Sequence, residues 1–278
     1  MSVQQLETSC AAARRGTIEI RSAGYPPNRI DLCDLSPARR EHGSADALVR
    51  GVCAYFAKRG YAVGGFCACT ASNVTGGAGL SSSAAFSVLV GTVLSRLYNG
   101  GRVPATEIAR AGQYAENEYF GKPSGLMDQM AAAVGGFVGI DFGGGELRIE
   151  PVQFDFGATG HSLCIVDTRG SHADLTDAYA AVRREMNDVA EKLGKHTLSE
   201  SSLQELMREL PRLREACGDR AVLRAFHFFN ENDRVEKQKA ALKAGDFEGF
   251  LKLVNESGES SYDYLQNLYS NSAVSEQG

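Results

Sequence analysis

The stretch Gly76-Gly77-Ala78-Gly79-Leu80-Ser81-Ser82-Ser83-Ala84-Ala85 decides how this sequence is interpreted. An apolar pattern with helical spacing follows it and ends at residues 99–101, Asn-Gly-Gly, which is a typical C-cap signal. Glycines allow backbone N–H groups to turn toward a ligand, and a helix start adds unpaired donors with a partial positive charge. Three serines add hydroxyl groups that can bind phosphate oxygens or Mg²⁺. The stretch therefore predicts a nucleotide phosphate site.

Glycine content alone leaves a second interpretation open, in which residues 76–79 are a flexible loop and residues 81–83 an N-cap cluster. Other phosphate motifs do not match. The Gly-Lys pairs at 121–122 and 194–195 lack the Ser or Thr that follows in a Walker loop, and residue 82 is serine where a dinucleotide fingerprint needs glycine. The Asp-Phe-Gly string at 141–143 lacks the companion motifs of protein kinases, so we interpret it as chance.

Residues 76–85 resemble the second motif of the GHMP kinases, which include galactokinase, homoserine kinase, mevalonate kinase and phosphomevalonate kinase. Residues 115–129, Ala-Glu-Asn-Glu-Tyr-Phe-Gly-Lys-Pro-Ser-Gly-Leu-Met-Asp-Gln, look like the galactokinase branch, for which Gly-Leu-Met-Asp-Gln is specific. Residues 167–184 and the segment 227–247 are also similar to that branch. The resemblance covers nearly the whole chain. It implies ATP-dependent phosphorylation of a sugar C1 hydroxyl, with galactose as the expected substrate.

The resemblance also implies roles for individual residues. Asp128 matches the aspartate that faces the C1 hydroxyl of the sugar and acts as a base or an orienting group. Gly125 matches the glycine whose backbone contacts the sugar, and Tyr179 matches the tyrosine whose hydroxyl reaches a sugar hydroxyl. Ser83 and Glu116 match the ligands of Mg²⁺, an ion that prefers hard oxygen ligands. The residues expected to bind ATP are Gly76, Gly77, Ala78, Gly79, Leu80, Ser81, Ser82 and Ser83.

Several of these candidates, taken alone, have a plain structural interpretation. Asp128 could be an acid at a helix start, Glu116 a solvated helix residue and Tyr179 a packing residue. The five histidines show no metal-binding spacing. His227 lies among phenylalanines, which favours a structural histidine over a ligand.

Two motifs of the resembled family are not found. The first, close to R-x-N-L-I-G-E-H-x-D, supplies an arginine for the transferring phosphoryl group and ligands for the sugar. Residues 40–42, Arg-Glu-His, match three of its letters, but they follow the predicted strand pair and lack the flanking apolar residues, so we interpret them as a coincidence. The third motif, a late glycine-rich segment, is also absent. We therefore expect a chain that is cut at both ends relative to a full enzyme.

These gaps leave two alternatives to a galactose kinase open. One is a catalytically reduced sensor of nucleotide or sugar on the same fold. The other is a kinase for N-acetylgalactosamine or for another GHMP substrate such as mevalonate.

Composition limits the partners. A net charge of -5 argues against a general nucleic-acid binder, and no stretch reaches the ~18 apolar residues that a membrane helix needs. The seven cysteines are scattered, and the spacing of Cys67 and Cys69 is typical of one face of a strand rather than of a zinc site. We therefore expect a cytoplasmic monomer whose partners are a sugar and ATP, with neither nucleic acid nor membrane.

The predicted fold is α+β in two domains, a mixed-sheet N-terminal domain over residues 1–160 and a helix-rich C-terminal α/β domain over residues 161–278. Asp128 is expected in the cleft between them. A strand at 163–167 would open the second domain, and helices would follow it. The elements expected before it are strands at 16–22, 30–35 and 65–71, helices at 44–59, 86–97, 104–119 and 126–134, and a hairpin of 137–142 with 147–152.

Overall fold

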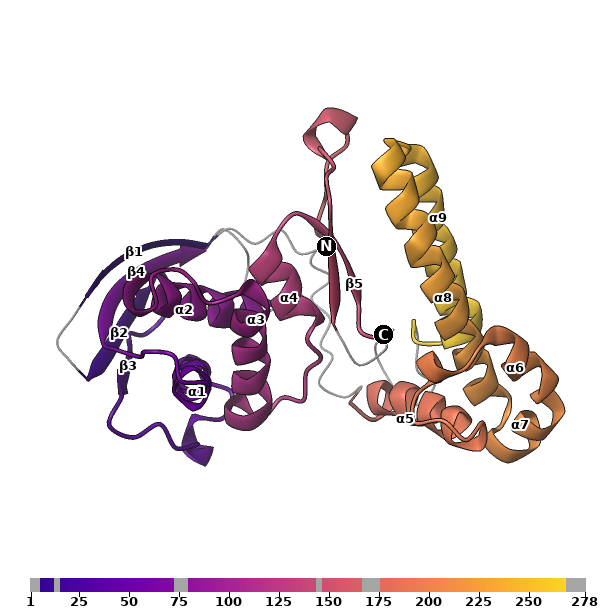
Figure 1. The fold of residues 1–278 in the computed structure, drawn as a ribbon, viewed down its shortest axis with the longest axis horizontal. Helices are drawn as coiled ribbons and strands as arrows, with labels where there is room; N and C mark the ends of the chain where they lie inside the picture. Colours follow the sequence, from indigo (N-terminus) through magenta and orange to yellow (C-terminus); the bar gives the residue numbers. More distant parts are fainter. Residues whose placement is uncertain (1–5, 13–15, 73–79, 144–146, 167–175, 269–278) are drawn as a thin grey trace. The chain divides into compact units, whose positions relative to one another are not determined.

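The computed structural model describes residues 6–12, 16–72, 80–143, 147–166 and 176–268 (Figure 1). The chain forms two compact units, residues 1–138 and 139–278. The division falls inside strand β5 (Phe137–Asp141). The expected domain boundary near residue 160 stays a prediction.

The first unit contains a mixed sheet of four strands. Its spatial order is β1-β4-β2-β3, in which β2 and β4 are parallel and the other neighbours are antiparallel. Strand β2 was expected from its alternating isoleucines, and Ile18 and Ile20 are indeed buried. The strands are β1 (Leu6–Ala12), β2 (Thr17–Ser22), β3 (Asn28–Asp31) and β4 (Phe66–Ser72).

Two expectations about this sheet need correction. The strand predicted at residues 30–35 is shorter and ends at Asp31, because side-chain turns follow it. The Asp31 carboxylate accepts a hydrogen bond from the backbone N–H of Cys33 at 2.9 Å, and Asp34 does the same for Ser36 at 2.9 Å. Strand β1 was not predicted, and it pairs along the whole length of β4.

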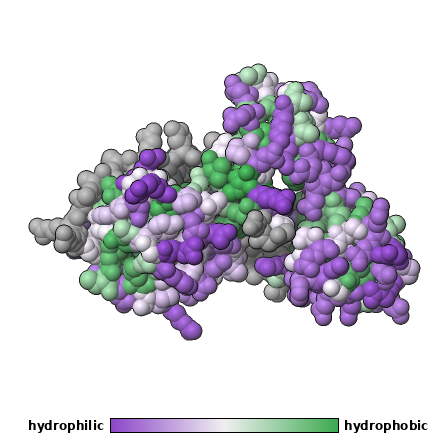
Figure 2. Space-filling model, in the orientation of Figure 1, coloured by the Kyte–Doolittle hydropathy of each residue, from purple (hydrophilic) through white to green (hydrophobic). Residues whose placement is uncertain are grey.

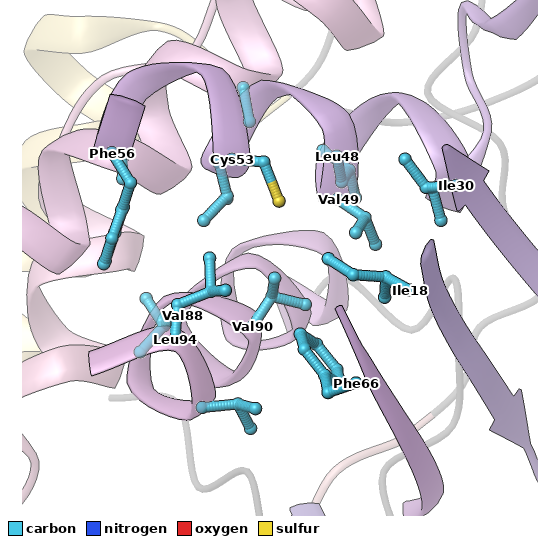
Figure 3. Close-up of a cluster of buried hydrophobic side chains, with 14 of the residues drawn as sticks. Ile18, Ile30, Leu48, Val49, Cys53, Phe56, Phe66, Val88, Val90 and Leu94 are labelled. Carbon is cyan, nitrogen blue, oxygen red and sulfur yellow. The ribbon is translucent and has the colours of Figure 1, made fainter. Parts of the chain in front are cut away.

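Helices pack beside this sheet. They are α1 (Ala45–Lys58), α2 (Ser82–Tyr98), α3 (Ala105–Tyr114) and α4 (Met127–Val134), with the short helices η1 (Arg39–Glu41) and η2 (Ala115–Phe120) beside them. Helices α1 and α2 contact strands of the sheet, and α3 and α4 pack against these helices. Side chains of α1 and α2 meet those of the strands in one apolar core (Figure 3). The predicted helix at 104–119 continues past α3 as the wider π-helical turn η2.

The side chain of Ser44 caps α1 by accepting a hydrogen bond from the N–H of Ala47 at 3.3 Å. Gly51 allows α1 to approach η2, since a Cβ at this position would lie 2.6 Å from the Cα of Ala115. The predicted helix over residues 44–59 is therefore confirmed, and close packing ties it to η2.

The second unit begins with the two-stranded sheet of β5 and β6 (Arg148–Val152) and is otherwise helical. Its core is built from small and branched apolar side chains of α5, α7 and α8, with Leu198 and Leu206. Around α6 and α7 the surface is mostly hydrophilic (Figure 2). The other elements are η3 (Gly157–Thr159), α5 (Thr176–Lys192), η5 (Leu198–Glu200), α6 (Leu203–Arg208), α7 (Leu210–Cys217), α8 (Asp219–Ala244), α9 (Phe247–Ser260) and η6 (Ser261–Leu265).

The strand predicted at residues 163–167 is wrong for the part that is described. Residues 161–166 have no regular structure and pair with no described strand, and the Ile165 and Val166 side chains are exposed. Residue 167 lies outside the described residues. A short apolar run gives a strand only where a partner edge accepts its hydrogen bonds.

Candidate active site

The start of α2 is the first component of the site. Of the eight residues expected to bind ATP, residues 76–79 lie outside the described residues, and residues 80–83 are described. Ser81 precedes the helix in a left-handed conformation, with φ 55° and ψ 44°, and its side chain does not cap α2. Such a backbone conformation costs a non-glycine residue roughly 1–2 kcal/mol, and an unused serine cap forgoes about 1 kcal/mol. Neither feature is explained by the helix itself.

Ser83 and Glu116, the pair expected to hold Mg²⁺, lie together. The Ser83 hydroxyl donates a hydrogen bond to Oε1 of Glu116 at 2.6 Å. Glu116 comes from η2, and only 2% of its surface is exposed, so the interpretation as a solvated helix residue is wrong. The π-helical turn changes the helical register just at this residue, and such turns are frequent at functional sites.

Asp128 lies in the first turn of α4, where the partial positive charge of the helix end favours a carboxylate. Its Oδ2 atom accepts a hydrogen bond from the Ser81 hydroxyl at 2.5 Å. The sequence reasoning placed these two residues in one site but did not predict that they touch. Two serines of one helix start therefore hold carboxylates from two other elements.

Gly125 precedes α4 in an exposed stretch, and no atom lies within 4 Å of the point where a Cβ would be. Its backbone is thus open on the side that a side chain would occupy. The expected contact with a sugar stays a prediction.

A buried layer lies beneath the two serine–carboxylate pairs. Gln129 follows Asp128 and is 1% exposed, and its Oε1 atom has no hydrogen-bond partner among the described residues. Gly112 on α3 makes room for it, since a Cβ there would lie 3.1 Å from Cγ of Gln129 and 3.2 Å from Cβ of Ser87. Ser87 in turn donates to the backbone oxygen of Ser83 at 2.9 Å. Sequence reasoning missed this layer, although a glycine inside a predicted helix was a signal for it.

Tyr179 is on α5, in the second unit, and its side chain is outside what the structure describes. Its role toward a sugar stays a prediction. His227 is buried on α8, and its Nδ1 atom is hydrogen-bonded to the Ser260 hydroxyl at 2.9 Å. Burial lowers the pKa of His227. The structural interpretation of this histidine agrees with that environment.

The Arg-Glu-His string at 40–42 belongs to a structural contact. The Glu41 carboxylate accepts hydrogen bonds from Nε and Nη2 of Arg50 on α1, at 2.8 and 3.0 Å. These hydrogen bonds raise the pKa of Arg50 above its usual value. Arg40 and His42 are exposed. The contact agrees with the interpretation of this string as a coincidence.

The donor set of the site fits a hard cation. Glu116 and Ser83 offer a carboxylate and a hydroxyl oxygen side by side, which suits Mg²⁺ with water or phosphate as further ligands. In the described part of the chain, no three His, Cys, Asp or Glu side chains cluster as a complete metal site. The described residues therefore offer part of a coordination shell, as is usual for Mg²⁺ bound together with a nucleotide.

None of the helices in the described part of the chain is both long enough and apolar enough to cross a membrane.

The residues of this site that are described lie within a segment that matches a known protein family. Residues 47–136 match the family described as GHMP kinases N terminal domain. The chain is 35% identical over 224 residues to galactokinase from Thermotoga petrophila, covering 80% of this chain and 59% of the relative. It is 33% identical over 243 residues to galactokinase from Streptomyces coelicolor, covering 85% and 61%. The chain thus spans about three fifths of the length of these curated relatives.

Solved structures show the same fold. The crystal structure of Lactococcus lactis galactokinase complexed with galactose matches with a TM-score of 0.75 and 22% identity, covering 97% of this chain and 70% of the other. Streptococcus pneumoniae phosphomevalonate kinase, in complex with phosphomevalonate and AMPPNP, matches with a TM-score of 0.54 and 14% identity, covering 95% and 72%. The expected two-part GHMP-kinase-like α+β fold is confirmed.

Proposed function

We propose that this chain, which carries the N-terminal domain of the GHMP kinases, transfers the γ-phosphoryl group of ATP to the C1 hydroxyl of galactose. The observation that carries the proposal is the meeting of three elements at the start of α2. Ser81 and Ser83 hold Asp128 of α4 and Glu116 of η2 at hydrogen-bonding distance. Phosphoryl transfer depends mainly on positioning and charge neutralisation, and this arrangement supplies both.

The start of α2 is the proposed phosphate site. The first N–H groups of a helix have no partner within the helix, and the Ser81 side chain leaves them uncapped. They are therefore free to donate to phosphate oxygens. Asp128 is the group proposed to orient the sugar C1 hydroxyl and accept its proton.

We propose Ser83 and Glu116 as the protein ligands of Mg²⁺. When bound with ATP, this ion would neutralise charge on the phosphates. Among the described residues no lysine or arginine pairs with Glu116, so its negative charge is available to a cation.

Two matched variants test the cation site. Glu116→Gln should abolish most of the Mg²⁺-dependent tightening of ATP binding, measured by calorimetry with and without the ion. Glu118→Gln removes an exposed acid two residues away and should leave it unchanged. If both variants lost this Mg²⁺-dependent tightening equally, or if Glu116→Gln kept it, Glu116 would not be a ligand.

The activity itself is tested by following ADP release with and without galactose, alongside N-acetylgalactosamine and mevalonate. Turnover that depends on galactose supports the proposal. If turnover occurs only with N-acetylgalactosamine or mevalonate, the chain is a kinase for that substrate and not for galactose. Binding of ATP and galactose without turnover supports the alternative of a catalytically reduced sensor.

We also propose that the protein works in the cytoplasm as a monomer. Scattered cysteines without paired spacing support the compartment. Light scattering at micromolar concentration tests the monomer, and a mass near twice 29.8 kDa would contradict it.

A further inference from the structure

Ser81 combines a strained backbone and an unused helix cap with one side-chain contact. It is one of two non-glycine residues with positive φ among those described. Serine is a favoured N-cap residue, yet here the hydroxyl makes no bond to α2 and donates to Asp128 instead. Strained residues of this kind persist where the surroundings hold them, and they cluster at ligand sites. The hydrogen bond from Ser81 to Asp128 is therefore expected to have a function of its own.

The contact joins the two halves of the proposed reaction. Ser81 belongs to the string 80–83 assigned to the nucleotide, and Asp128 is the carboxylate assigned to the sugar. Both side chains are half-buried, so each can still reach a ligand. Two residues further on, Ser83 holds Glu116 in the same way. The backbone at the start of α2 is thus tied to α4 and η2 by two hydroxyl–carboxylate bonds.

We propose that Ser81 is a positioning residue that couples the two ligands, so that nucleotide and sugar tighten each other's binding; this inference rests on the proposed function. A nucleotide that fixes residues 80–83 also fixes the Ser81 hydroxyl and, through it, one oxygen of Asp128. The sugar then has less to order when it binds. Linkage makes the effect reciprocal, so galactose strengthens nucleotide binding by the same factor.

Calorimetry on the full chain measures this coupling directly. The dissociation constant of a non-hydrolysable ATP analogue with Mg²⁺ is determined without galactose and at saturating galactose. For the wild-type chain, the dissociation constant without galactose divided by that with galactose should be about five or more, the lower range of typical coupling. Ser81→Gly removes the hydroxyl and suits a left-handed backbone, and it should bring the ratio close to one.

Variants at the same position separate the hydrogen bond from the backbone. Ser81→Asn tolerates the left-handed conformation and offers an N–H donor, so it should retain more of the coupling than Ser81→Gly. Ser81→Asp places a carboxylate beside Asp128 and should both abolish the coupling and weaken galactose binding. Thr92→Ala removes a hydroxyl bonded to the backbone oxygen of Val88 on the same helix, and it should leave the ratio unchanged.

The outcomes distinguish the inference from the proposed function. If neither ligand binds the wild-type chain, both fail. If both ligands bind but the wild-type ratio is one or lower, or if Ser81→Gly keeps the wild-type ratio, the inference fails and the proposed function stands. Circular dichroism checks folding; should Ser81→Gly not fold, equal ratios for Ser81→Asn and Ser81→Asp would overturn the inference.

Discussion

The carboxylates of the candidate site and a half-buried carboxylate of the second unit have different kinds of partner. In the first unit, Glu116 and Asp128 accept hydrogen bonds from serine hydroxyls, and among the described residues no lysine or arginine pairs with either. In the second unit, Glu185 is held by Arg220 and Arg224. A hydroxyl partner satisfies a lone pair but leaves the negative charge in place, whereas an arginine cancels it. The first arrangement leaves the negative charge available to a ligand, whereas in the second the charge forms ion pairs that hold the structure together.

The same contrast appears at the surface of the second unit. Glu150 on β6 is paired with Lys239 and Lys243 of α8. Hydrogen bonds from these two lysines lower the pKa of Glu150 to about 2. Since the pair lies in solvent, its contribution to the free energy of unfolding is small. The charge of Glu150, like that of Glu185, is therefore balanced by basic side chains.

The largest expected effect is on turnover. Asp128→Asn keeps the shape of the side chain but removes the proton acceptor, so galactose-dependent ADP release should fall by roughly 10²- to 10⁴-fold. ATP binding should change little, because the phosphates are assigned to the start of α2. A steady-state assay with calorimetry on the same preparation measures both.

Asp141→Asn is the control for this prediction. Asp141 is an exposed carboxylate at the end of β5. A variant at Asp128 with near-normal rate would show that this aspartate is not the base.

The second effect concerns stability and tests the structural use of charge. Glu185→Ala leaves the guanidinium of Arg224, which is 3% exposed, without its carboxylate. Burial already lowers the pKa of Arg224, so an uncompensated charge there is costly. The free energy of unfolding, measured by urea unfolding, should drop by about 3–5 kcal/mol.

A double variant and a surface pair sharpen this test. Glu185→Leu combined with Arg224→Met replaces the pair by apolar groups and should recover much of the loss. Asp233→Ala breaks an exposed i,i+4 pair with Lys237 and should cost less than about 0.5 kcal/mol. Equal losses from Glu185→Ala and Asp233→Ala would contradict the structural assignment.

The third effect compares glycines of the two units. Gly51→Ala forces a methyl group against the backbone of Ala115, next to Glu116, and should cost about 1–3 kcal/mol. The shift should also weaken Mg²⁺-dependent nucleotide binding. Gly258→Ala on α9 meets no atom within 4 Å and should stabilise the chain by about 0.4–1 kcal/mol. Thermal unfolding of both variants measures the difference, and a stabilising Gly51→Ala would show that the α1–η2 contact is looser than described.

Local patterns were enough to predict much of the first unit. The alternation of β2, the helix over residues 44–59 and the shared face of Cys67 and Cys69 on β4 all follow from residues close in sequence. Strand β1 was not predicted because its sequence, Leu-Glu-Thr-Ser-Cys-Ala-Ala, has few strongly apolar residues. An edge strand gains most of its stability from the partner with which it pairs, and that partner is 54 or more residues away in the chain.

The sequence predicted which residues belong to the site but not which of them are in contact. The resemblance to a family named Ser83, Glu116 and Asp128, whereas the bond from Ser81 to Asp128 spans 47 positions and depends on a backbone conformation that serine rarely adopts. The amide oxygen of Gln129, which has no hydrogen-bond partner in the described part of the chain, likewise lies where α2, α3 and α4 meet. Contacts of this kind follow from tertiary packing, which sequence spacing does not encode.

The smallest effect is the pH dependence of the second unit. Burial lowers the pKa of His227 below its usual value of 6.5, so the unfolded chain binds the proton more readily than the folded chain. The contribution of neutral His227 is therefore complete above pH 6.5 and is lost as the pH falls toward the folded-state pKa. The loss is limited to about 1.4 kcal/mol per pH unit for one proton.

His227→Asn tests this by keeping a polar group near Ser260 while removing the titration. Urea unfolding of both proteins from pH 8 to pH 5, followed on the helical signal, gives the comparison. The wild-type chain should lose stability relative to the variant only below pH 6.5, since all other residues are the same in both proteins and their contributions cancel. The charge of Arg234, which also lowers the pKa of His227, adds to the effect. A difference that is constant with pH would mean that His227 acts through packing alone.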